Sequence, residues 1–401
     1  MTDNFKLLSD AEHIRKRFSM YGGSQVVQEE VAFINADFQK VNIVGGLLKV
    51  INEIIDNSVD EHVRTKGEFA TRIDVDIDAD GTITVGDNGR GIPSIEVGTP
   101  DGKEYQMVAA FTRARAGSNF DDENRESIGM NGVGSMITFV TSSMFDAKSA
   151  DGNLEVHLVG ENGQVKRVKT KETVRKGTTV KFRPDYKFFG METIDQAHTD
   201  IIEERVRSLA LAFDNIKFRF NRKAIKLKFA DYFGSCEVFN TEKAIFGIAK
   251  SDGSFQSHSL VNGLSVKGGT HIDYFISAVI ADLRDVLKRR RKVDITAARL
   301  KQHLRVHAIV NGFPALKFDS QTKERVTNSN AECRDAIGEF DTSKIVNKLM
   351  KNAELIDEIC AYTRLQEDLN AKKDLGKLEK TKKVKSDKYF AAIGHRTDRI
   401  F

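Results

Sequence analysis

A run of helical period at residues 43–63 predicts an amphipathic helix with two unlike sides. At about 100° per residue, one side of this helix is apolar and the opposite side is polar. The apolar side carries Leu47, Ile51, Ile54 and Ile55, and the polar side carries Glu53, Asn57 and Asp60. The first side predicts contact with a core, and the second predicts either a solvated face or a functional one.

Elsewhere the pattern alternates between strand and helix periods. Period-two alternation predicts strands at residues 71–78, 82–85, 154–159, 164–169 and 178–183. The first two strands flank the turn Ala79-Asp80-Gly81 and form a hairpin with one buried face. Helical patterns lie at residues 106–115, 136–140, 200–213 and 272–289. Helices mixed with antiparallel strands predict an α+β layer sandwich, whose first domain closes near residue 222.

The composition is that of an ordinary globular protein. With 401 residues, 40% hydrophobic and 30% charged, the chain is long enough for two or three domains. No apolar run approaches the roughly 20 residues of a membrane span, and no secretory signal pattern is present, so we expect an intracellular, cytoplasmic protein without membrane contact. Three scattered cysteines support neither a disulfide framework nor a zinc site.

Charge matters only where it is clustered. The net charge of +4 says nothing about nucleic acid, but residues 288–292 read KRRRK and further lysines lie between residues 372 and 388. Such runs bind polyanions or are merely solvated faces and tails.

The first candidate chemistry lies on the polar side of the 43–63 helix. Glu53 and Asn57 are one helical turn apart, so a carboxylate and a neutral oxygen ligand lie close together. This pair suits a water molecule and a hard cation such as Mg²⁺, which prefers oxygen ligands. Acids placed there for solubility alone are the alternative.

A second candidate is GDNGRGIP at residues 86–93, directly after a predicted strand. Gly89 and Gly91 let the backbone pass close to a flat ligand, while a buried Asp87 accepts a hydrogen bond from an exocyclic amine such as that of adenine. Alone, the segment also fits a tight turn with a capping aspartate.

A third candidate is a polar loop at residues 116–127 that leads into GMNGVGS at residues 129–135. Glycines ahead of a helix N-terminus present backbone N–H groups to a phosphate. The segment is not a Walker A loop, because no Gly-Lys-Ser/Thr follows, and no strand immediately precedes it as a Rossmann turn would need.

In this order, EIIDNSVDE, DNGRGIP, GMNGVGS and KGTTVKF resemble the motifs of the GHKL ATPases, which have the Bergerat nucleotide-binding fold. VKGGTHIDYF at residues 266–275 and FDSQTKERVT at residues 318–327 resemble the transducer segments of type II topoisomerases. Together the six segments resemble that family, and within it the ATPase-bearing large subunit of the T-even-type bacteriophage enzymes.

The resemblance implies a Bergerat (GHKL) ATP-binding α/β sandwich, then a ribosomal-S5-like transducer domain and a C-terminal helical stalk. The expected limits are an N-terminal arm at 1–30, the ATPase domain at 31–221, the transducer at 222–343, a stalk with a basic end at 344–388 and a tail at 389–401. No EGDSA-type acidic metal motif follows, so the resemblance assigns DNA cleavage to another domain or subunit.

The resemblance also implies roles for individual residues. Glu53 matches the general base that polarises the attacking water, and Asn57 matches the Mg²⁺ ligand. Gln321 and Lys323 match a loop of the second domain whose lysine touches the terminal phosphate of ATP. Because that phosphate would fix the angle between the two domains, its presence selects one arrangement.

The base of ATP is assigned to the second motif by the same resemblance. Asp87 matches the adenine-reading acid, Thr178 assists it through a bridging water, and Gly91 supplies the close backbone approach. Arg90 and Glu61 match a pair that braces the pocket. The ribose and phosphate loop and the phosphate-binding lid are assigned to Ser118, Asn119, Gly129, Asn131, Gly132, Val133 and Gly134.

The function implied is the ATP-operated entrance gate of a type II topoisomerase, with ATP and Mg²⁺ as cofactors. ATP would close two copies of the chain into a homodimer, with the N-terminal arm exchanged between them, and capture a double-stranded DNA segment for passage through a cleavage core. The candidate DNA-binding residues are Lys288, Arg289, Arg290, Arg291 and Lys292. A GHKL clamp of the mismatch-repair or chaperone type and a nucleotide-responsive scaffold are the alternatives.

Overall fold

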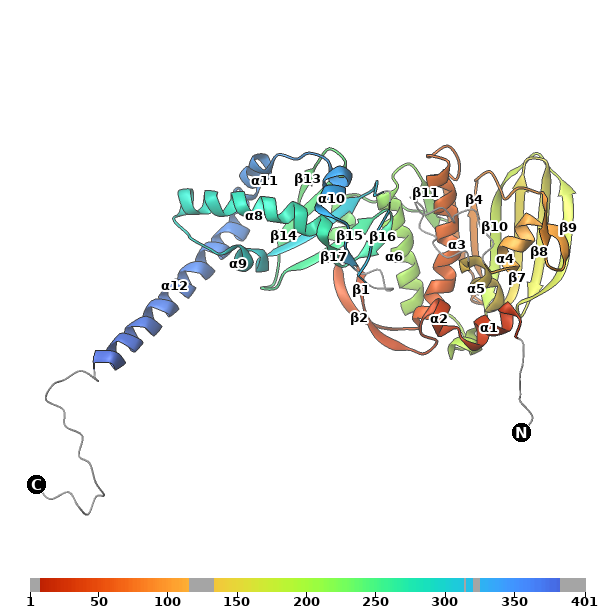
Figure 1. The fold of residues 1–401 in the computed structure, drawn as a ribbon, viewed down its shortest axis with the longest axis horizontal. Helices are drawn as coiled ribbons and strands as arrows, with labels where there is room; N and C mark the ends of the chain where they lie inside the picture. The colour runs from red at the N-terminus through yellow and green to blue at the C-terminus, as the bar shows by residue number, and fades with distance from the viewer. Residues whose placement is uncertain (1–7, 115–132, 314, 320–324, 383–401) are drawn as a thin grey trace, which may run out of the picture. The chain divides into compact units, whose positions relative to one another are not determined.

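The computed structural model describes residues 8–114, 133–313, 315–319 and 325–382 (Figure 1). The chain divides into two compact units. The first unit comprises residues 1–249, 257–275 and 305–340, and the second comprises residues 250–256, 276–304 and 341–401. The domain limits expected from the sequence remain predictions.

An eight-stranded sheet organises the first unit (Figure 1). Its strand order is β12-β11-β3-β4-β10-β7-β8-β9. The strands are β3 (Arg72–Ile77), β4 (Ile83–Asp87), β7 (Ser142–Asp151), β8 (Leu154–Glu161), β9 (Gln164–Glu172), β10 (Lys176–Pro184), β11 (Lys217–Phe220) and β12 (Lys223–Ala224). Neighbouring strands run antiparallel, except that β11 pairs parallel to β3. The predicted β3–β4 hairpin and the other predicted strands are thus present.

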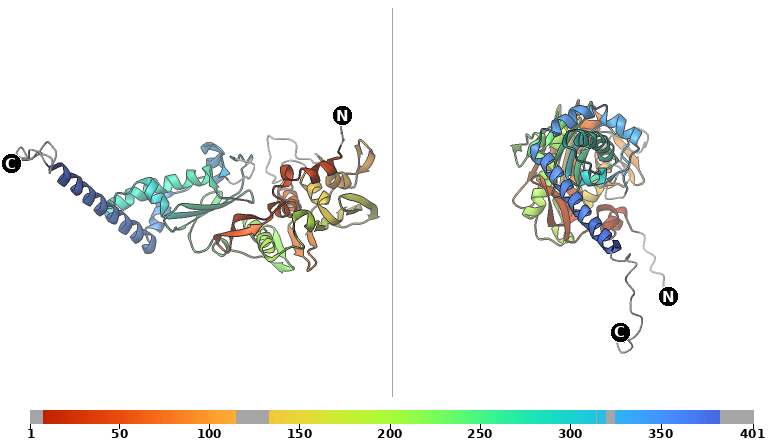
Figure 2. Two further views of the ribbon diagram at one scale, coloured as in Figure 1. Left: turned by 90° about the horizontal axis from the view of Figure 1, so that it is seen from below. Right: turned by 90° about the vertical axis from the view of Figure 1, so that its left-hand side faces the viewer.

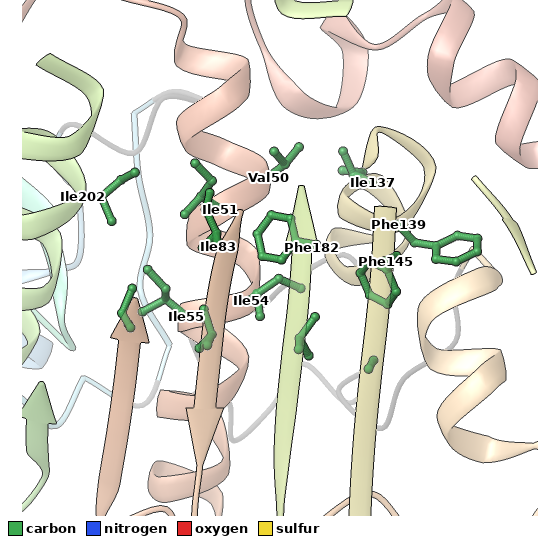
Figure 3. Packing of buried hydrophobic residues seen from close by; sticks show 14 of the residues in the cluster. Val50, Ile51, Ile54, Ile55, Ile83, Ile137, Phe139, Phe145, Phe182 and Ile202 are labelled. Atoms are coloured by element: carbon green, nitrogen blue, oxygen red, sulfur yellow. The ribbon is translucent and has the colours of Figure 1, made fainter. Parts of the chain in front are cut away.

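One face of this sheet is covered by helices and holds the core. The main helices are α3 (Gly45–Arg64), α4 (Gln106–Thr112), α5 (Gly134–Val140) and α6 (Gln196–Ala212). Figure 3 shows Ile51 and Ile54 of α3 beside Ile83 of β4 and Phe182 of β10. The predicted apolar side of α3 is confirmed, because Ile51 is fully buried together with its neighbours on that side. Burial of this side fixes which side of α3 remains for polar chemistry.

The N-terminal segment contains elements that the sequence pattern did not predict. These are α1 (Asp10–Lys16), α2 (Ser19–Gly22) and the hairpin β1 (Gln28–Ile34) and β2 (Asp37–Ile43). Ile14 and Phe18 are buried in the main core, and Arg15 donates to Asp185 at 2.6 Å. These contacts hold the segment to its own chain, and exchange of an arm between two chains remains a prediction.

A second, five-stranded sheet follows, with order β13-β14-β18-β15-β16. Its strands are β13 (Glu237–Asn240), β14 (Ala244–Lys250), β15 (Gln256–Val261), β16 (Leu264–Val266) and β18 (Leu304–Val310). The short strands β17 (Gly268–Gly269) and β19 (Arg325–Val326) pair in parallel. A side chain at Gly269 would collide with the backbone of Val326, so this glycine permits the pairing. The two segments with transducer resemblance therefore meet at these strands.

Helices form most of the second unit. It contains the part of helix α8 (Thr270–Arg291) from residue 276 onward. The other helices of this unit are α9 (Ala297–Gln302), α11 (Thr342–Leu349) and α12 (Ala353–Lys382). Both views of Figure 2 show α12, in blue, as one continuous helix. Lys250 anchors its start through ion pairs to Glu354 at 3.2 Å and Glu358 at 2.6 Å. The predicted charged helical segment is therefore two helices, α11 and α12.

Buried histidines join the β1–β2 hairpin to the five-stranded sheet. Phe33 of β1 packs on His258 of β15 with ring centroids 4.0 Å apart, and Phe233 stacks on His307 of β18 at 4.7 Å. Burial lowers the pKa of His258 to about 3 and that of His307 to about 4. Both rings are therefore neutral in the folded protein at neutral pH.

This arrangement predicts that the fold loses stability in mild acid. The unfolded chain binds protons at these histidines below about pH 6.5, whereas the folded chain does not until about pH 4 or lower. Unfolding therefore becomes easier as the pH falls through that window. We expect His307→Phe to reduce the fall in Tm between about pH 7 and about pH 5. The half-buried His13 gives the control variant His13→Phe, and an equal fall of Tm in the wild type and His307→Phe would contradict the explanation.

Candidate functional site

Glu53 lies on the polar side of α3, against the start of α5. Its carboxylate forms an ion pair with Lys49, one turn earlier on the same helix. It also lies so close to Gly134 that a side chain at position 134 would collide with it. The side chain of Glu53 is 16% exposed, so most of its surface is covered by the protein. The glycine thus lets the Glu53 carboxylate approach the start of α5 without moving aside.

Asn57, one turn further along α3, connects the same two helices. Its side-chain Nδ2 donates to Ser135 Oγ at 2.9 Å, while Thr138 Oγ1 donates to the Val50 carbonyl at 2.7 Å. The first bond uses an N–H of the Asn57 amide and leaves its oxygen available to a ligand. Glu53, Asn57 and Gly134 are therefore brought together, as the sequence motifs suggested.

The polar side of α3 is less exposed than the helical pattern predicted. Asp60 is only 3% exposed, although the pattern placed it on the open side with Glu53. Asp56 is also held inside the fold, where it pairs with Arg205 of α6 at 2.6 Å. The prediction was wrong for Asp60 because α3 packs on α6 as well as on the sheet, so its buried stripe is wider than one side.

Asp87 ends β4 on the helix-covered face of the sheet. Ser58 of α3 donates to its Oδ2 at 2.9 Å, and the backbone N–H of Gly89 donates to its Oδ1 at 2.8 Å. Burial raises the pKa of this carboxyl, although both hydrogen bonds oppose the shift. The Asp87 carboxyl is thus a hydrogen-bond acceptor held in place at the edge of the core, where burial disfavours its charged form.

Asp87 belongs to a row of polar side chains across three strands. In register, Asp87 lies opposite Thr178 of β10, which lies opposite Ser149 of β7. Ser149 Oγ and Thr178 Oγ1 are 3.0 Å apart, and Ser149 also accepts from the backbone N–H of Ile92 at 2.7 Å. The next row on the same face is Val85, Val180 and Ala147, so the apolar core ends where this polar row begins.

The segment after β4 passes close to β7, as its glycines suggested. Gly91 has φ +79°, and a side chain there would collide with the carbonyl of Ala150. Its neighbour Arg90 binds Glu61 of α3 through two guanidinium nitrogens, at 2.7 and 3.1 Å. Burial raises the pKa of Glu61, but the bonds from Arg90 outweigh it and leave the pKa below its ordinary value. The Arg90–Glu61 pair therefore joins the segment to α3 and remains ionised.

Several predicted site residues lie outside the described residues. These are Ser118, Asn119, Gly129, Asn131, Gly132, Gln321 and Lys323. Of the predicted lid, Val133 and Gly134 are described, and they form the N-cap and first residue of α5. Within the described ranges, no group of three or more His, Cys, Asp and Glu side chains is placed to hold a metal ion.

The structure adds Lys49, Ser58, Ser135 and Ser149 to the site, none of which the sequence analysis had selected. Ser58 and Ser135 lie within the motifs EIIDNSVDE and GMNGVGS, so a search of the polar residues of those motifs would have found them. Ser149 could be found only from strand register, because it is distant in sequence from Asp87 and no strand was predicted at residues 142–151.

The basic run predicted to contact DNA lies at the end of α8 in the second unit. Most of its cations already have partners: Lys288 pairs with Asp294 at 2.8 Å, and Arg291 lies 3.7 Å from Asp357. Arg289 and Arg290 donate to oxygens of their own unit, at 3.3 and 3.4 Å. The two carboxylates offset part of the charge of this run, whereas the neutral oxygens bonded to Arg289 and Arg290 do not.

Comparisons with known proteins agree with this geometry. A family model described as "Histidine kinase-, DNA gyrase B-, and HSP90-like ATPase" matches residues 43–187, and one described as "DNA gyrase B" matches residues 223–376. The DNA topoisomerase large subunit of Enterobacteria phage T4 is 38% identical over 364 residues, which cover 88% of this chain and 70% of that protein. The chain belongs to the type II DNA topoisomerase family. The matched residues contain the α3, β4 and α5 positions described above.

Solved structures of the family show the same fold. The ATPase region of Saccharomyces cerevisiae topoisomerase II bound to ICRF-187 has a TM-score of 0.76 and 26% identity, over 90% of this chain and all of that one. The ATPase and transducer domains of Balamuthia mandrillaris topoisomerase II give a TM-score of 0.78 at 22% identity. The α+β class and the ATPase-region fold expected from the motifs are therefore confirmed.

The chain corresponds to the ATPase part of these enzymes. It spans 70% of the phage protein, but the match to Saccharomyces cerevisiae DNA topoisomerase 2, at 28% identity, covers 97% of this chain and only 29% of that protein. Within the part of the chain that the structure describes, no helix is both long and apolar enough to cross a membrane.

Proposed function

We propose that this chain binds ATP with Mg²⁺, hydrolyses it, and uses the nucleotide to close a homodimeric gate around a double-stranded DNA segment. The observation that supports this most strongly is the meeting of Glu53, Asn57 and Gly134 beside the Asp87 row. A carboxylate, an amide oxygen and a glycine-led helix thus lie next to an acceptor at the end of the core. Cleavage of DNA would belong to a cleavage-core domain or subunits that complete the topoisomerase.

Asp87 has the properties needed to select adenine. Its oxygens are oriented by Ser58 and Gly89, so they can accept from an exocyclic amine without first reorganising. Thr178 lies beside it in register and Gly91 keeps the adjoining backbone close. A base without an amine at this place would leave the carboxylate unpaired in a buried site, which costs binding energy.

The residues present also fit Mg²⁺, which favours oxygen ligands and neutralises phosphate charge when bound. Asn57 offers its amide oxygen because Ser135 accepts from its N–H group, and that bond also fixes the orientation of the amide. A site that uses one protein oxygen beside nucleotide phosphates is typical of Mg²⁺ in nucleotide enzymes.

Glu53 is the proposed general base. Its carboxylate is held by Lys49 and faces Gly134, where the phosphate-binding lid would begin. From that place it would orient a water for attack on the terminal phosphate and accept its proton. Gln321 and Lys323 would contribute from the second domain, with Lys323 neutralising the charge that develops. The strand that follows this loop, β19, pairs with β17 of the other transducer-like segment.

The comparisons do not favour the alternatives of a mismatch-repair or chaperone-type clamp and of a nucleotide-responsive scaffold. The transducer-like segments pair with each other in β17 and β19, and the second family model covers this region. A scaffold without turnover would not need a carboxylate fixed at Glu53.

We expect Asn57→Ala to lose the Mg²⁺-dependent part of ATP affinity. Removal of the amide oxygen should weaken ATP binding in Mg²⁺ by about tenfold or more and leave binding in EDTA almost unchanged. Calorimetric titration of ATP under both conditions measures this difference. The control is Asn42→Ala, at an exposed asparagine of β2. If Asn57→Ala retains the full effect of Mg²⁺, Asn57 is not a ligand.

A further inference from the structure

We propose that the open face of the eight-stranded sheet binds the phosphate backbone of duplex DNA at its β9 end. The contact surface, here named the basic sheet face, consists of Lys148, Arg167, Lys169 and Lys171. All four residues are exposed. They belong to β7 and β9, at the end of the sheet that Figure 1 shows in yellow. They take no part in the nucleotide site, and they are distant in sequence from the basic run at residues 288–292.

Strand register places these cations on one face. On β8, Val156 and Leu158 point into the core, so their neighbour His157 points to the opposite, open face. His157 lies directly between Lys148 of β7 and Lys169 of β9. Arg167 and Lys171 flank Lys169 at intervals of two residues, and therefore share its face. Three of the four cations therefore lie in a line along β9, and Lys148 lies two strands to the side of the middle one, all on the side of the sheet away from α3.

Cations outnumber carboxylates on this surface. In the described part of the chain, none of the four cations forms an ion pair. Two carboxylates lie in the same three rows: Asp146, which is bonded to His157 at 2.9 Å, and Glu155, which lies between Ala150 and Lys171. Two more cations of this face, Lys181 and Arg183 of β10, extend it toward the sheet centre. They lie 3.4 and 3.7 Å from Asp78 and Asp80.

Lysines on an edge strand often serve only to prevent pairing with another sheet. That role explains Lys169 and Lys171, because β9 is the edge of the sheet. It does not explain Lys148, which lies two strands inside the edge. Arg167, Lys169 and Lys171 also follow one another on the same face of β9, with Lys148 about 10 Å from Lys169, so these like charges repel one another. An external anion would relieve this repulsion.

The spacing suits a nucleic-acid backbone. Side chains two residues apart on β9 are separated by about 6.8 Å, so Arg167 and Lys171 are about 13 Å apart. The row from Lys148 to Lys169 adds a contact about 10 Å to the side. One DNA strand places a charge every 3.4 Å or so along the axis, so phosphates of a duplex on this face are spaced closely enough to reach each of the four cations. No recognition of base sequence is expected, since lysine and arginine would contact phosphates only.

This inference rests on the proposed function only for the identity of the polyanion, because DNA is the substrate of the family. It assigns a contact that the predicted run at the end of α8 does not supply. There, Lys288 and Arg291 are paired with carboxylates of their own unit, whereas none of the four cations of the basic sheet face forms an ion pair among the described residues.

The test uses the full chain and fluorescence anisotropy with a labelled duplex of about 30 base pairs, from about 50 to about 200 mM salt. One variant changes four residues of the face to alanine: Lys148, Arg167, Lys169 and Lys171. A matched variant removes the same charge at four exposed lysines outside the eight-stranded sheet and far apart in the sequence: Lys103, Lys187, Lys226 and Lys351. We expect the first variant to bind DNA about tenfold or more weakly at low salt, with a salt slope smaller by about 3 to 4.

The matched variant should stay within about threefold of the wild type. An equal loss of DNA affinity in the two variants would mean that only net charge matters, and this would overturn the proposal. An unchanged DNA affinity in the variant of the basic sheet face would also overturn it. A further comparison uses the protein bound to an anionic resin and two competitors, polyglutamate and the duplex. If polyglutamate displaces the protein as effectively as the duplex does, the surface binds anions in general, which would also contradict the proposal. ATP hydrolysis without DNA should be the same in all three proteins, so failure of the nucleotide site is recognised separately.

Discussion

Replacing Glu53 by glutamine is expected to lower the rate of ATP hydrolysis by about 10²- to 10⁴-fold, with ATP affinity almost unchanged. Glutamine has the size of glutamate, so the close approach to Gly134 is retained and the two helices keep their positions. What is lost is a carboxylate able to accept a proton from water. The change should therefore appear in kcat, because the interaction that is removed exists only during the reaction.

The matched control is Glu161→Gln, the same chemical change at an exposed carboxylate at the end of β8. Steady-state hydrolysis and an ATP titration, both in Mg²⁺, separate catalysis from binding. Near-normal turnover in Glu53→Gln would remove Glu53 as the base, and loss of ATP binding in this variant would indicate a structural role instead.

Replacing Asp87 by asparagine is expected to have the opposite profile, with ATP binding lost and the fold retained. The amide would present an N–H group where the exocyclic amine of adenine donates. The loss of a hydrogen bond to a charged acceptor is worth about 1.5–3 kcal/mol, which is roughly 10- to 150-fold in Kd. The unpaired donor that remains adds to this loss. Titration of ATP and of GTP by the wild type and the variant measures both affinity and base selection.

Asp87→Asn should also leave the unliganded protein at least as stable as the wild type. Burial raises the pKa of Asp87, so the folded state holds this proton more tightly than the unfolded state does. Its contribution to stability is therefore largest at low pH and declines as the pH rises through the raised value. Asparagine has no charge to bury, so Tm at neutral pH should not fall. A large fall in Tm together with lost binding would mean that Asp87 acts structurally.

Sequence periodicity predicted the parts of the fold in which one side is clearly apolar. Helix α3 and the β3–β4 hairpin are such elements, because each has a buried face that the core imposes. The hairpin of β1 and β2 was missed because most of β1 is exposed and carries no strong alternation. Strand β7 was missed because Ser149 and other small polar residues interrupt its apolar face.

The candidate site was predictable in the same uneven way. Glu53 and Asn57 are neighbours on one helix, so local geometry alone brings them together. The approach of Gly134 to Glu53 and the row from Asp87 to Ser149 depend on tertiary packing and on strand register. Those relations cannot be derived from local patterns, and only the resemblance of the motifs suggested that Gly134 and Thr178 share a site with Glu53.

The central claim is that ATP operates this chain as a dimeric gate. Light scattering of the full chain, with and without a nonhydrolysable ATP analogue and Mg²⁺, tests it most directly. The proposed function predicts a change from the mass of a monomer to that of a dimer when the nucleotide is added, and no change with the analogue in Asp87→Asn. A mass that stays monomeric while calorimetry shows the analogue bound would contradict the claim.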